Sequence, residues 1–180
     1  MGAPLADALG APLLPLVVRK LPVPISPEMG FGAVAIDGSL VLNDRLVGEL
    51  GLSRDRIDSI AADVREEVER RAREYMGDDF IPDVLGRDVF LIDDGLATGY
   101  SVIAAARMVK DLAPRSLILG VPVSPEGSLR TVAPYFDEAY CLIAQEYPPF
   151  AVASFYQDFH DMSDDEVRRI LKRANHDGKD

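Results

Sequence analysis

Two kinds of hydrophobic pattern run along this chain, and each predicts a different kind of element. Continuous apolar runs of strand length predict strands at Leu14–Val18, Val89–Ile92, Leu117–Val121 and Ala139–Ile143. The last three runs read VFLI, SLILGV and AYCLIA, which is typical of strands buried on both faces of a parallel sheet. The sequence therefore predicts an α/β fold, with a mostly parallel central sheet flanked by helices.

Apolar residues at helical spacing predict helices between these runs. In SRDRIDSIAADVREEVERRAREYM, Ser53 is the expected N-cap of a long amphipathic helix with a solvated charged face. Its apolar positions are Ile57, Ile60, Ala61, Val64, Val68 and Ala72. A short helix is expected to end at Gly10, and another helix is expected at Val102–Leu112.

The C-terminal part has its own helix signal. Ser163-Asp164-Asp165-Glu166 has the form of a capping box, in which a serine and a glutamate three residues later each satisfy a backbone amide of the other. We expect a final helix over about 163–174 and a frayed tail at 175–180.

Glycine and proline predict the turns. Leu21–Gly32 holds three prolines and two glycines, so we expect a loop there. In AVAIDGSLVLN, Asp37-Gly38 is the favoured dipeptide of a type I′ turn, which predicts a small β-hairpin. The same stretch resembles the aspartate motif of haloacid-dehalogenase-like phosphatases, but Ala35 stands where their nucleophilic aspartate belongs, which favours the hairpin.

Composition restricts the function classes. With 180 residues and 48% hydrophobic content, we expect a single domain over 1–180. The net charge of −11 argues against general binding to nucleic acid, which needs a basic face. The one cysteine, Cys141, lies in an apolar run, where an inert buried thiol in a reducing compartment is expected. No apolar run reaches membrane-spanning length, so we expect a cytoplasmic protein without a membrane partner.

The candidate chemistry lies in VFLIDDGLATGYS, residues Val89–Ser101, called the signature segment below. Asp93 and Asp94, the acidic pair, follow a predicted strand, at the sheet edge where ligands bind in such folds. The loop that follows consists of Gly95, Leu96, Ala97, Thr98, Gly99, Tyr100 and Ser101. Because it feeds a helix, its amides favour a phosphate monoester, while the carboxylates suit ribose hydroxyls. One ribose 5-phosphate moiety satisfies both halves.

The signature segment resembles the phosphoribosyl pyrophosphate motif of the type I phosphoribosyltransferases. The acidic pair, Thr98, Gly99 and Ser101 are in register with that motif, whereas Gly95 stands where many members carry an aliphatic residue. Four further segments, VVRKL, GAVAIDGSLVLN, GVPVSPEG and SFYQDFHDMSDDEV, resemble a poorly characterised branch of the family. The resemblance covers nearly the whole chain.

The resemblance implies Mg²⁺-dependent transfer of a phosphoribosyl group between phosphoribosyl pyrophosphate and a nitrogenous base or similar acceptor, in nucleotide metabolism or salvage. It implies that Asp93 and Asp94 hold the ribose, that Ala97–Ser101 bind the 5-phosphate, and that Arg19 or Lys20 reaches the pyrophosphate. The metal is expected to be held mainly by the substrate, without a dedicated protein site. Phosphoribosyl pyrophosphate or a nucleoside monophosphate is the expected small-molecule partner, and a homodimer is the expected assembly.

The start of the chain, the acceptor and several aromatic residues have no single interpretation from the sequence. The family normally begins with a strand and a pyrophosphate loop, and that strand has no counterpart before MGAPLADALG. A non-catalytic module that senses phosphoribosyl pyrophosphate or a nucleotide is therefore the alternative function. The acceptor is not identified, and roles for Tyr147, Phe150, Phe155 and Tyr156 are left open. We assign neither histidine, His160 nor His176, to catalysis.

Two other classes are disfavoured. LIDDG resembles the acidic pocket of response-regulator receiver domains, but Pro122 and Gln145 follow the later strands where a phosphoacceptor aspartate and a lysine are needed. A P-loop hydrolase is disfavoured because no GxxxxGK[ST] run occurs.

Overall fold

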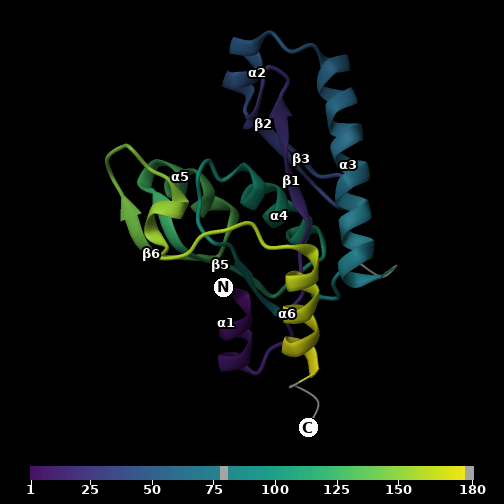
Figure 1. Cartoon of the computed structure of the whole chain (residues 1–180), viewed down its shortest axis with the longest axis vertical. Coiled ribbons are helices and arrows are strands. Elements are labelled where there is room, and N and C mark those ends of the chain that lie inside the picture. Colours follow the sequence, from purple (N-terminus) through teal and green to yellow (C-terminus); the bar gives the residue numbers. More distant parts are fainter. Residues whose placement is uncertain (78–80, 177–180) are drawn as a thin grey trace. The chain divides into compact units, whose positions relative to one another are not determined.

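A computed structural model of the chain describes residues 1–77 and 81–176. These residues form two compact units (Figure 1). The first unit comprises Met1–Pro15, Val89–Thr98 and Ser116–Asp180, and the second comprises Leu16–Asp88 and Gly99–Arg115. The chain passes from the first unit to the second between Thr98 and Gly99, inside the signature segment.

The first unit contains a three-stranded parallel sheet in the order β4-β5-β6. Its strands are β4 (Asp88–Ile92), β5 (Ser116–Pro125) and β6 (Glu138–Gln145). Its helices are α1 (Gly2–Leu9), α5 (Glu126–Val132) and α6 (Asp164–His176), with short 3₁₀ helices η1 (Ala133–Tyr135) and η2 (Val152–Phe155). Helix α5 and η2 pack against β5, and α1 packs against α6.

Burial within this sheet is concentrated on its central strand. Leu117, Leu119, Val121 and Val123 of β5 alternate along the strand and are all buried. The strands VFLI and AYCLIA are present as predicted, but the expectation that both of their faces are buried is wrong. The reason is their place in the sheet, since β4 and β6 are its two edges within the described part of the chain.

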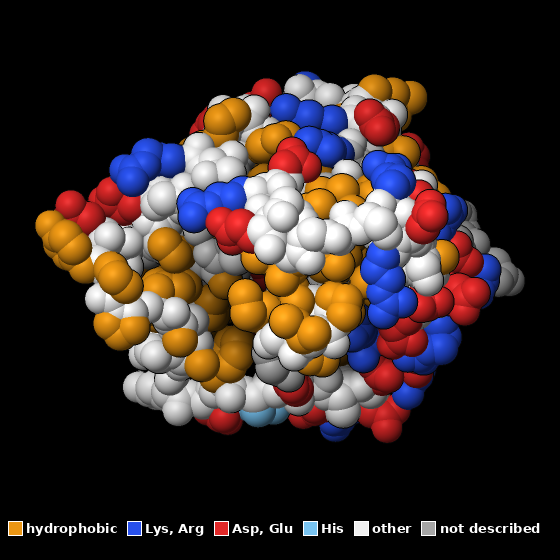
Figure 2. Space-filling model, turned by 90° about the horizontal axis from the view of Figure 1, so that it is seen from above, with side chains coloured by type: hydrophobic (Ala, Val, Ile, Leu, Met, Phe, Trp, Pro, Cys, Tyr) orange, Lys and Arg blue, Asp and Glu red, His pale blue; other side chains and the backbone are white. Residues whose placement is uncertain are grey.

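The exposure of β6 is large for an apolar strand. Tyr140 is 59%, Leu142 83% and Ile143 50% exposed, and Figure 2 shows hydrophobic side chains gathered on the side where β6 lies. Cys141 of the same strand is half-buried, not fully buried as expected, and burial raises the pKa of its thiol.

The second unit is built on an antiparallel sheet in the order β1-β2-β3. Its strands are β1 (Val18–Val23), β2 (Ser26–Ala35) and β3 (Leu40–Leu42). Its helices are α2 (Asp44–Leu50), α3 (Arg54–Met76) and α4 (Tyr100–Asp111). Helices α3 and α4 both pack against β1 and β2, and Figure 1 shows α3 running beside these strands. Fully buried Leu21, Phe31, Val68 and Met108 form much of this core.

Two predictions about this sheet are wrong, and proline is the physical reason for both. Leu14–Val17 is not a strand, because Pro12 and Pro15 lack the amide N–H groups that a ladder needs, and β1 begins only at Val18. The predicted loop Leu21–Gly32 is instead part of a hairpin. Pro22 is tolerated there because β1 is an edge strand and its register with β2 shifts at that residue.

The places of the predicted turns and caps are confirmed. The hairpin at Asp37-Gly38 joins β2 to β3 as predicted, but its turn is not of type I′, because that type needs a positive φ at both residues and only Gly38, at 87°, has one. The Gly38 amide instead donates to the Ala35 carbonyl over 2.9 Å, so the turn spans residues 35–38. Ser53 Oγ accepts a hydrogen bond from the amide of Arg56 at the start of α3. Gly10 ends α1 in the left-handed conformation. Acidic and basic side chains alternate on the side of Figure 2 where α3 lies, as expected of a solvated helix face.

The C-terminal helix agrees with its predicted start and differs at its end. Ser163 and Glu166 form the reciprocal capping box, with the Ser163 amide donating to Glu166 Oε2 over 2.9 Å and the Glu166 amide donating to Ser163 Oγ over 3.4 Å. Helix α6 continues to His176, two residues beyond the predicted end at about Ala174, so residues 175–176 are not part of a frayed tail. The rest of the predicted tail lies outside the described residues.

Candidate active site

The signature segment forms a strand, a loop and the start of a helix. Strand β4 ends at Ile92, the acidic pair follows at once, and α4 begins at Tyr100. The acidic pair and the residues up to Thr98 belong to the first unit, and Gly99 begins the part in the second unit. The structure therefore has the acidic pair at the carboxyl end of a parallel strand, the place that the sequence predicted.

The loop of the first unit is fixed to its sheet by backbone hydrogen bonds. The Asp93 amide donates to the Gly120 carbonyl over 3.3 Å, and the Leu96 amide donates to the Val123 carbonyl over 2.9 Å. Leu96 is only 1% exposed, so it anchors the loop in the core and does not face a ligand. The hydroxyl of Ser128, on α5, donates to the Ala97 carbonyl over 2.6 Å.

The two carboxylates lie in different environments. Asp93 is half-buried and Asp94 is exposed, and the Asp94 amide donates to Asp93 Oδ1 over 2.9 Å. Burial, and after it the negative charge of Asp94, raises the pKa of Asp93 to about 6. Burial also raises the pKa of Asp94. When both carboxylates are ionised, the site holds two adjacent negative charges, an arrangement suited to a cation or to hydroxyl donors.

Gly95 is required by its surroundings. A Cβ atom on this residue would lie 2.8 Å from Val123 Cγ2 and 2.9 Å from Val152 Cγ1, closer than real side-chain contacts. The aliphatic residue that many members of the resembled family carry here would not fit. Val152 of η2 occupies that space instead.

A tyrosine that the sequence left without a role contacts this loop. The Tyr156 hydroxyl donates to the backbone carbonyl of Asp94 over 2.6 Å, across a separation of 62 residues. The Tyr156 ring also packs against Phe159, with ring centroids 5.2 Å apart. No local pattern at Tyr156 indicates this bond.

The helix half of the signature has the features of an anion site. Gly99 is the N-cap of α4, has a φ of 81°, and makes no side-chain capping bond. The first-turn amides of a helix have no partner within the helix, and the helix dipole is positive at this end. Tyr100 and Ser101 are the first two residues of α4. Thr98 is the exposed residue directly before Gly99.

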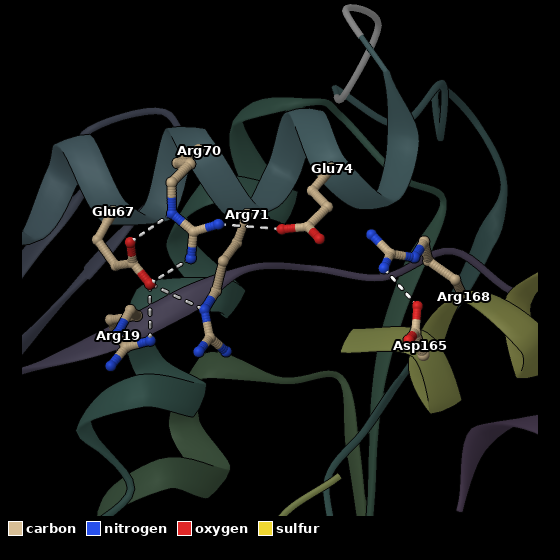
Figure 3. A network of polar contacts seen from close by, with 7 residues as sticks. All are labelled: Arg19, Glu67, Arg70, Arg71, Glu74, Asp165 and Arg168. Carbon is tan, nitrogen blue, oxygen red and sulfur yellow. Dashed lines mark hydrogen bonds and ion pairs between the residues drawn. The ribbon is translucent and has the colours of Figure 1, made fainter. Parts of the chain in front are cut away.

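The basic residues expected at the pyrophosphate lie elsewhere in the local structure than predicted. Arg19 and Lys20 are inside β1 of the second unit, not at the end of a strand. Arg19 Nη1 lies 3.5 Å from Glu67 Oε1, and Figure 3 shows Glu67 shared by Arg19, Arg70 and Arg71. The hydrogen bond from Arg70 is the largest cause that lowers the pKa of Glu67 to about 2.

Figure 3 also shows a separate ion pair on α6. Arg168 Nη2 lies 2.6 Å from Asp165 Oδ1, one turn apart on the exposed face of that helix. It belongs to the first unit and stabilises α6 locally.

Neither a metal-binding cluster nor a membrane-spanning helix is found among the described residues. No cluster of three or more His, Cys, Asp or Glu residues within 1–77 and 81–176 is arranged to hold a metal ion. No helix in those ranges has both the length and the apolar character needed to cross a bilayer.

Comparison with known proteins identifies relatives over nearly the whole chain, although no protein-family model matches it. A solved structure, that of TT1426 from Thermus thermophilus, superimposes with a TM-score of 0.73 and 32% sequence identity, covering 95% of this chain and 80% of that one. This chain belongs to one family with TT1426.

Curated relatives add a functional name. Two proteins from Mycobacterium tuberculosis, one from strain CDC 1551 / Oshkosh and one from strain H37Rv, are each 40% identical over 173 residues, or 96% of this chain. Both carry the name "Putative phosphoribosyl transferase". The chain spans 39% of their length.

Proposed function

We propose that this chain is a phosphoribosyltransferase of the type I kind, which transfers a 5-phosphoribosyl group between phosphoribosyl pyrophosphate and a nitrogenous acceptor. The observation that carries the proposal is an acidic pair at the end of strand β4, followed within seven residues by a helix with no side-chain cap. The similarity to proteins named as phosphoribosyl transferases supports the same reaction class.

The acidic pair would bind the ribose and stabilise its charge. When pyrophosphate leaves, positive charge develops on the ribose ring, and fixed carboxylates stabilise it more in the transition state than in the bound substrate. Asp94 is exposed, so its side chain suits direct contact with a ligand. Asp93, which is half-buried and held by the Asp94 amide, keeps the pair in place.

The residues after the acidic pair would hold the 5-phosphate. Ala97–Ser101 offer backbone amides at the helix start and the hydroxyls of Thr98 and Ser101. The positive φ of Gly99 brings the backbone into the tight path that such a loop needs. These interactions are the same in the substrate and in the transition state, so they serve binding.

A magnesium ion fits this donor set as a companion of the substrate. Two adjacent carboxylates supply hard oxygen atoms, and Mg²⁺ prefers such ligands while keeping water and phosphate in its shell. When bound, the ion would offset the negative charge of the leaving pyrophosphate. Arg19 and Lys20 are the candidate protein groups for the pyrophosphate itself. For Arg19 this role requires that it exchange its ion pair with Glu67 for the ligand.

A transfer assay tests this function through Asp94. With phosphoribosyl pyrophosphate, Mg²⁺ and a panel of purine and pyrimidine bases, the wild-type protein should release pyrophosphate with at least one acceptor. Asp94→Asn keeps the size of the side chain but removes its charge, so turnover should fall by roughly 100-fold to 1000-fold with a much smaller change in affinity.

The control for this assay is Asp83→Asn. Asp83 is also an aspartate, but its side chain is 83% exposed on the surface of the second unit, so turnover should stay unchanged. Equal losses in the two variants would contradict a specific role of Asp94.

One observation favours a second candidate, a non-catalytic module that senses phosphoribosyl pyrophosphate or a nucleotide. Arg19, a pyrophosphate candidate, is already engaged by Glu67. Under this alternative the wild-type protein binds phosphoribosyl pyrophosphate but transfers to no base, and Asp94→Asn changes affinity alone.

A further inference from the structure

The segment from Val152 to Tyr156 contacts the acidic pair from a distant part of the chain. It comprises the 3₁₀ helix η2 and the residue that follows it, and we call it the η2 segment. Two of its side chains touch the loop after β4, Val152 at Gly95 and Tyr156 at Asp94. All of these residues belong to the first unit.

The Tyr156 hydrogen bond fixes the direction of a peptide plane. In a trans peptide, the Asp94 carbonyl and the Gly95 amide lie in one plane and point to opposite sides. A donor 2.6 Å from the carbonyl therefore also sets where the Gly95 amide points. The next peptide plane is also held, because its amide, that of Leu96, donates to the Val123 carbonyl over 2.9 Å.

Packing at Gly95 restrains the same plane. The methyl groups of Val152 and Val123 lie where a Cβ on residue 95 would be, and this leaves the backbone little room to move toward them. The apolar side chain that supports this loop is thus supplied by the η2 segment and not by the signature itself.

The Tyr156 phenol is suited to act as a lasting donor. Burial first, and then the charges of Asp94 and Asp93, raises the pKa of Tyr156 above its ordinary value. A phenol with a raised pKa loses its proton less readily than a free one, which favours its role as a donor. The contact with Phe159 holds the ring in the orientation that the bond needs.

From these contacts we propose that Tyr156 is a positioning residue, which acts through the Asp94 backbone to aim the acidic pair at the ribose of the phosphoribosyl ligand. The inference rests on the proposed function and deepens it by adding a residue outside the signature. It assigns to the η2 segment the task of holding the carboxylates in the geometry that stabilises the transition state.

The test compares Tyr156→Phe with Tyr140→Phe. Both variants remove a phenolic hydroxyl and its hydrogen bond, but the Tyr140 hydroxyl donates to Glu138 on the exposed strand β6. Amide hydrogen exchange of residues 93–98 is measured without ligand, and the Kd for Mg²⁺ with phosphoribosyl pyrophosphate and the kcat of transfer are measured separately.

Tyr156→Phe should exchange several-fold faster at residues 93–98, which reports the loss of one hydrogen bond. Its kcat should fall about 10-fold while Kd changes less than about 3-fold. This difference is expected when a variant loses the correct position of a charge in the transition state but keeps its binding of the substrate. Tyr140→Phe should match the wild type in all three measurements.

Each alternative outcome has a separate meaning. Unchanged amide exchange at residues 93–98 in Tyr156→Phe overturns the claim that Tyr156 fixes the loop, whatever the wild-type protein binds. Faster exchange with unchanged kcat shows a merely structural bond and overturns the positioning role. A wild-type protein that binds no phosphoribosyl ligand overturns the proposed function, and with it the ribose as the target, while the exchange measurement still decides whether Tyr156 fixes the loop.

Discussion

At the scale of single residues, the acidic pair shows how one chain position changes the chemistry of the next. Asp93 and Asp94 are identical side chains, yet one is half-buried and the other exposed. Burial raises the pKa of Asp93 to about 6, with the charge of Asp94 as the second cause. A carboxylate kept at such a cost to folding is expected where its charge is used in function.

This raised pKa predicts a pH-dependent gain in stability for Asp93→Asn. In the unfolded chain an aspartate has a pKa of about 3.9, so between about pH 4 and 6 the folded protein binds the extra proton. The stability of the wild type should therefore fall as pH rises through that window. The asparagine variant does not ionise, so it should be more stable than the wild type by about 1–2 kcal/mol at pH 7.5.

The measurement is urea unfolding of both proteins without ligand from pH 4 to 8. The difference between them should be smallest near pH 4, where Asp93 is protonated in the folded wild type and about half protonated in the unfolded chain. Asp83→Asn, the same change at an exposed surface position, is measured alongside as the control. A difference that stays constant over the whole range would contradict the raised pKa.

Gly95 supports a second prediction at this scale, on the close packing around one missing side chain. Gly95→Ala places a Cβ 2.8 Å from Val123 and 2.9 Å from Val152, so it should destabilise the protein by about 1–3 kcal/mol. In a Val152→Ala background one of these clashes is removed, and the cost of the same change should be smaller by about 1 kcal/mol.

Urea unfolding of the four proteins of this double-mutant cycle measures the coupling. Gly127→Ala is the control, because Gly127 lies in helix α5 of the same unit with nothing within 4 Å of an added Cβ, so alanine should be neutral or slightly stabilising there. Additive costs for Gly95→Ala and Val152→Ala would show that η2 does not press on the signature loop.

At the scale of elements, the sequence predicted the ends of helices and strands where a cap or a turn gives a strong local signal. The caps at Ser53 and Ser163 and the place of the hairpin at Asp37-Gly38, though not its turn type, could be predicted directly, because each depends on residues within a few positions. The loop predicted around Pro22 was wrong. A strand tolerates proline where it is an edge strand, and this is a property of the whole sheet. The exposed AYCLIA strand was misread for the same reason.

Gly99 is both the N-cap of helix α4 and part of the proposed phosphate-binding loop. Its φ of 81° is strained for a β-branched residue, so Gly99→Val should distort the start of α4 and reduce binding of phosphoribosyl pyrophosphate at least 100-fold, in an enzyme or a sensor alike. Isothermal titration with Mg²⁺ present checks this.

Gly51→Val is the matched control for this change. Gly51 follows α2 with a φ of 61° and nothing within 4 Å of an added Cβ, so valine there is strained in a comparable way without touching the signature. It should lose stability and keep affinity. Equal losses of affinity would mean that the effect at Gly99 is general unfolding.

At the scale of the whole molecule, the sequence predicted only one part of the candidate site. The acidic pair and the loop after it are contiguous, so a motif could identify them and place them at the end of β4. Tyr156 reaches the same loop from 62 residues away, and Val152 fills a space that only folding creates. Such contacts depend on how η2 packs on β5, which no local pattern encodes.

The net charge of −11 affects which ligands the protein can bind. A protein so acidic repels polyanions in general, so it should bind one only at a specific site. With Mg²⁺, phosphoribosyl pyrophosphate at 100 times its Kd should stabilise the folded protein by roughly 2.7 kcal/mol, which raises the melting temperature by several degrees. Nucleoside monophosphates should act in the same direction, since they carry the same ribose 5-phosphate, and free ATP should act less. Chelation of the metal by EDTA should weaken the effect of phosphoribosyl pyrophosphate more than that of a monophosphate, because only the former carries the pyrophosphate whose charge the ion offsets. A thermal shift of equal size for ATP and phosphoribosyl pyrophosphate, or none with any phosphoribosyl ligand, would contradict a site built for a phosphoribosyl group.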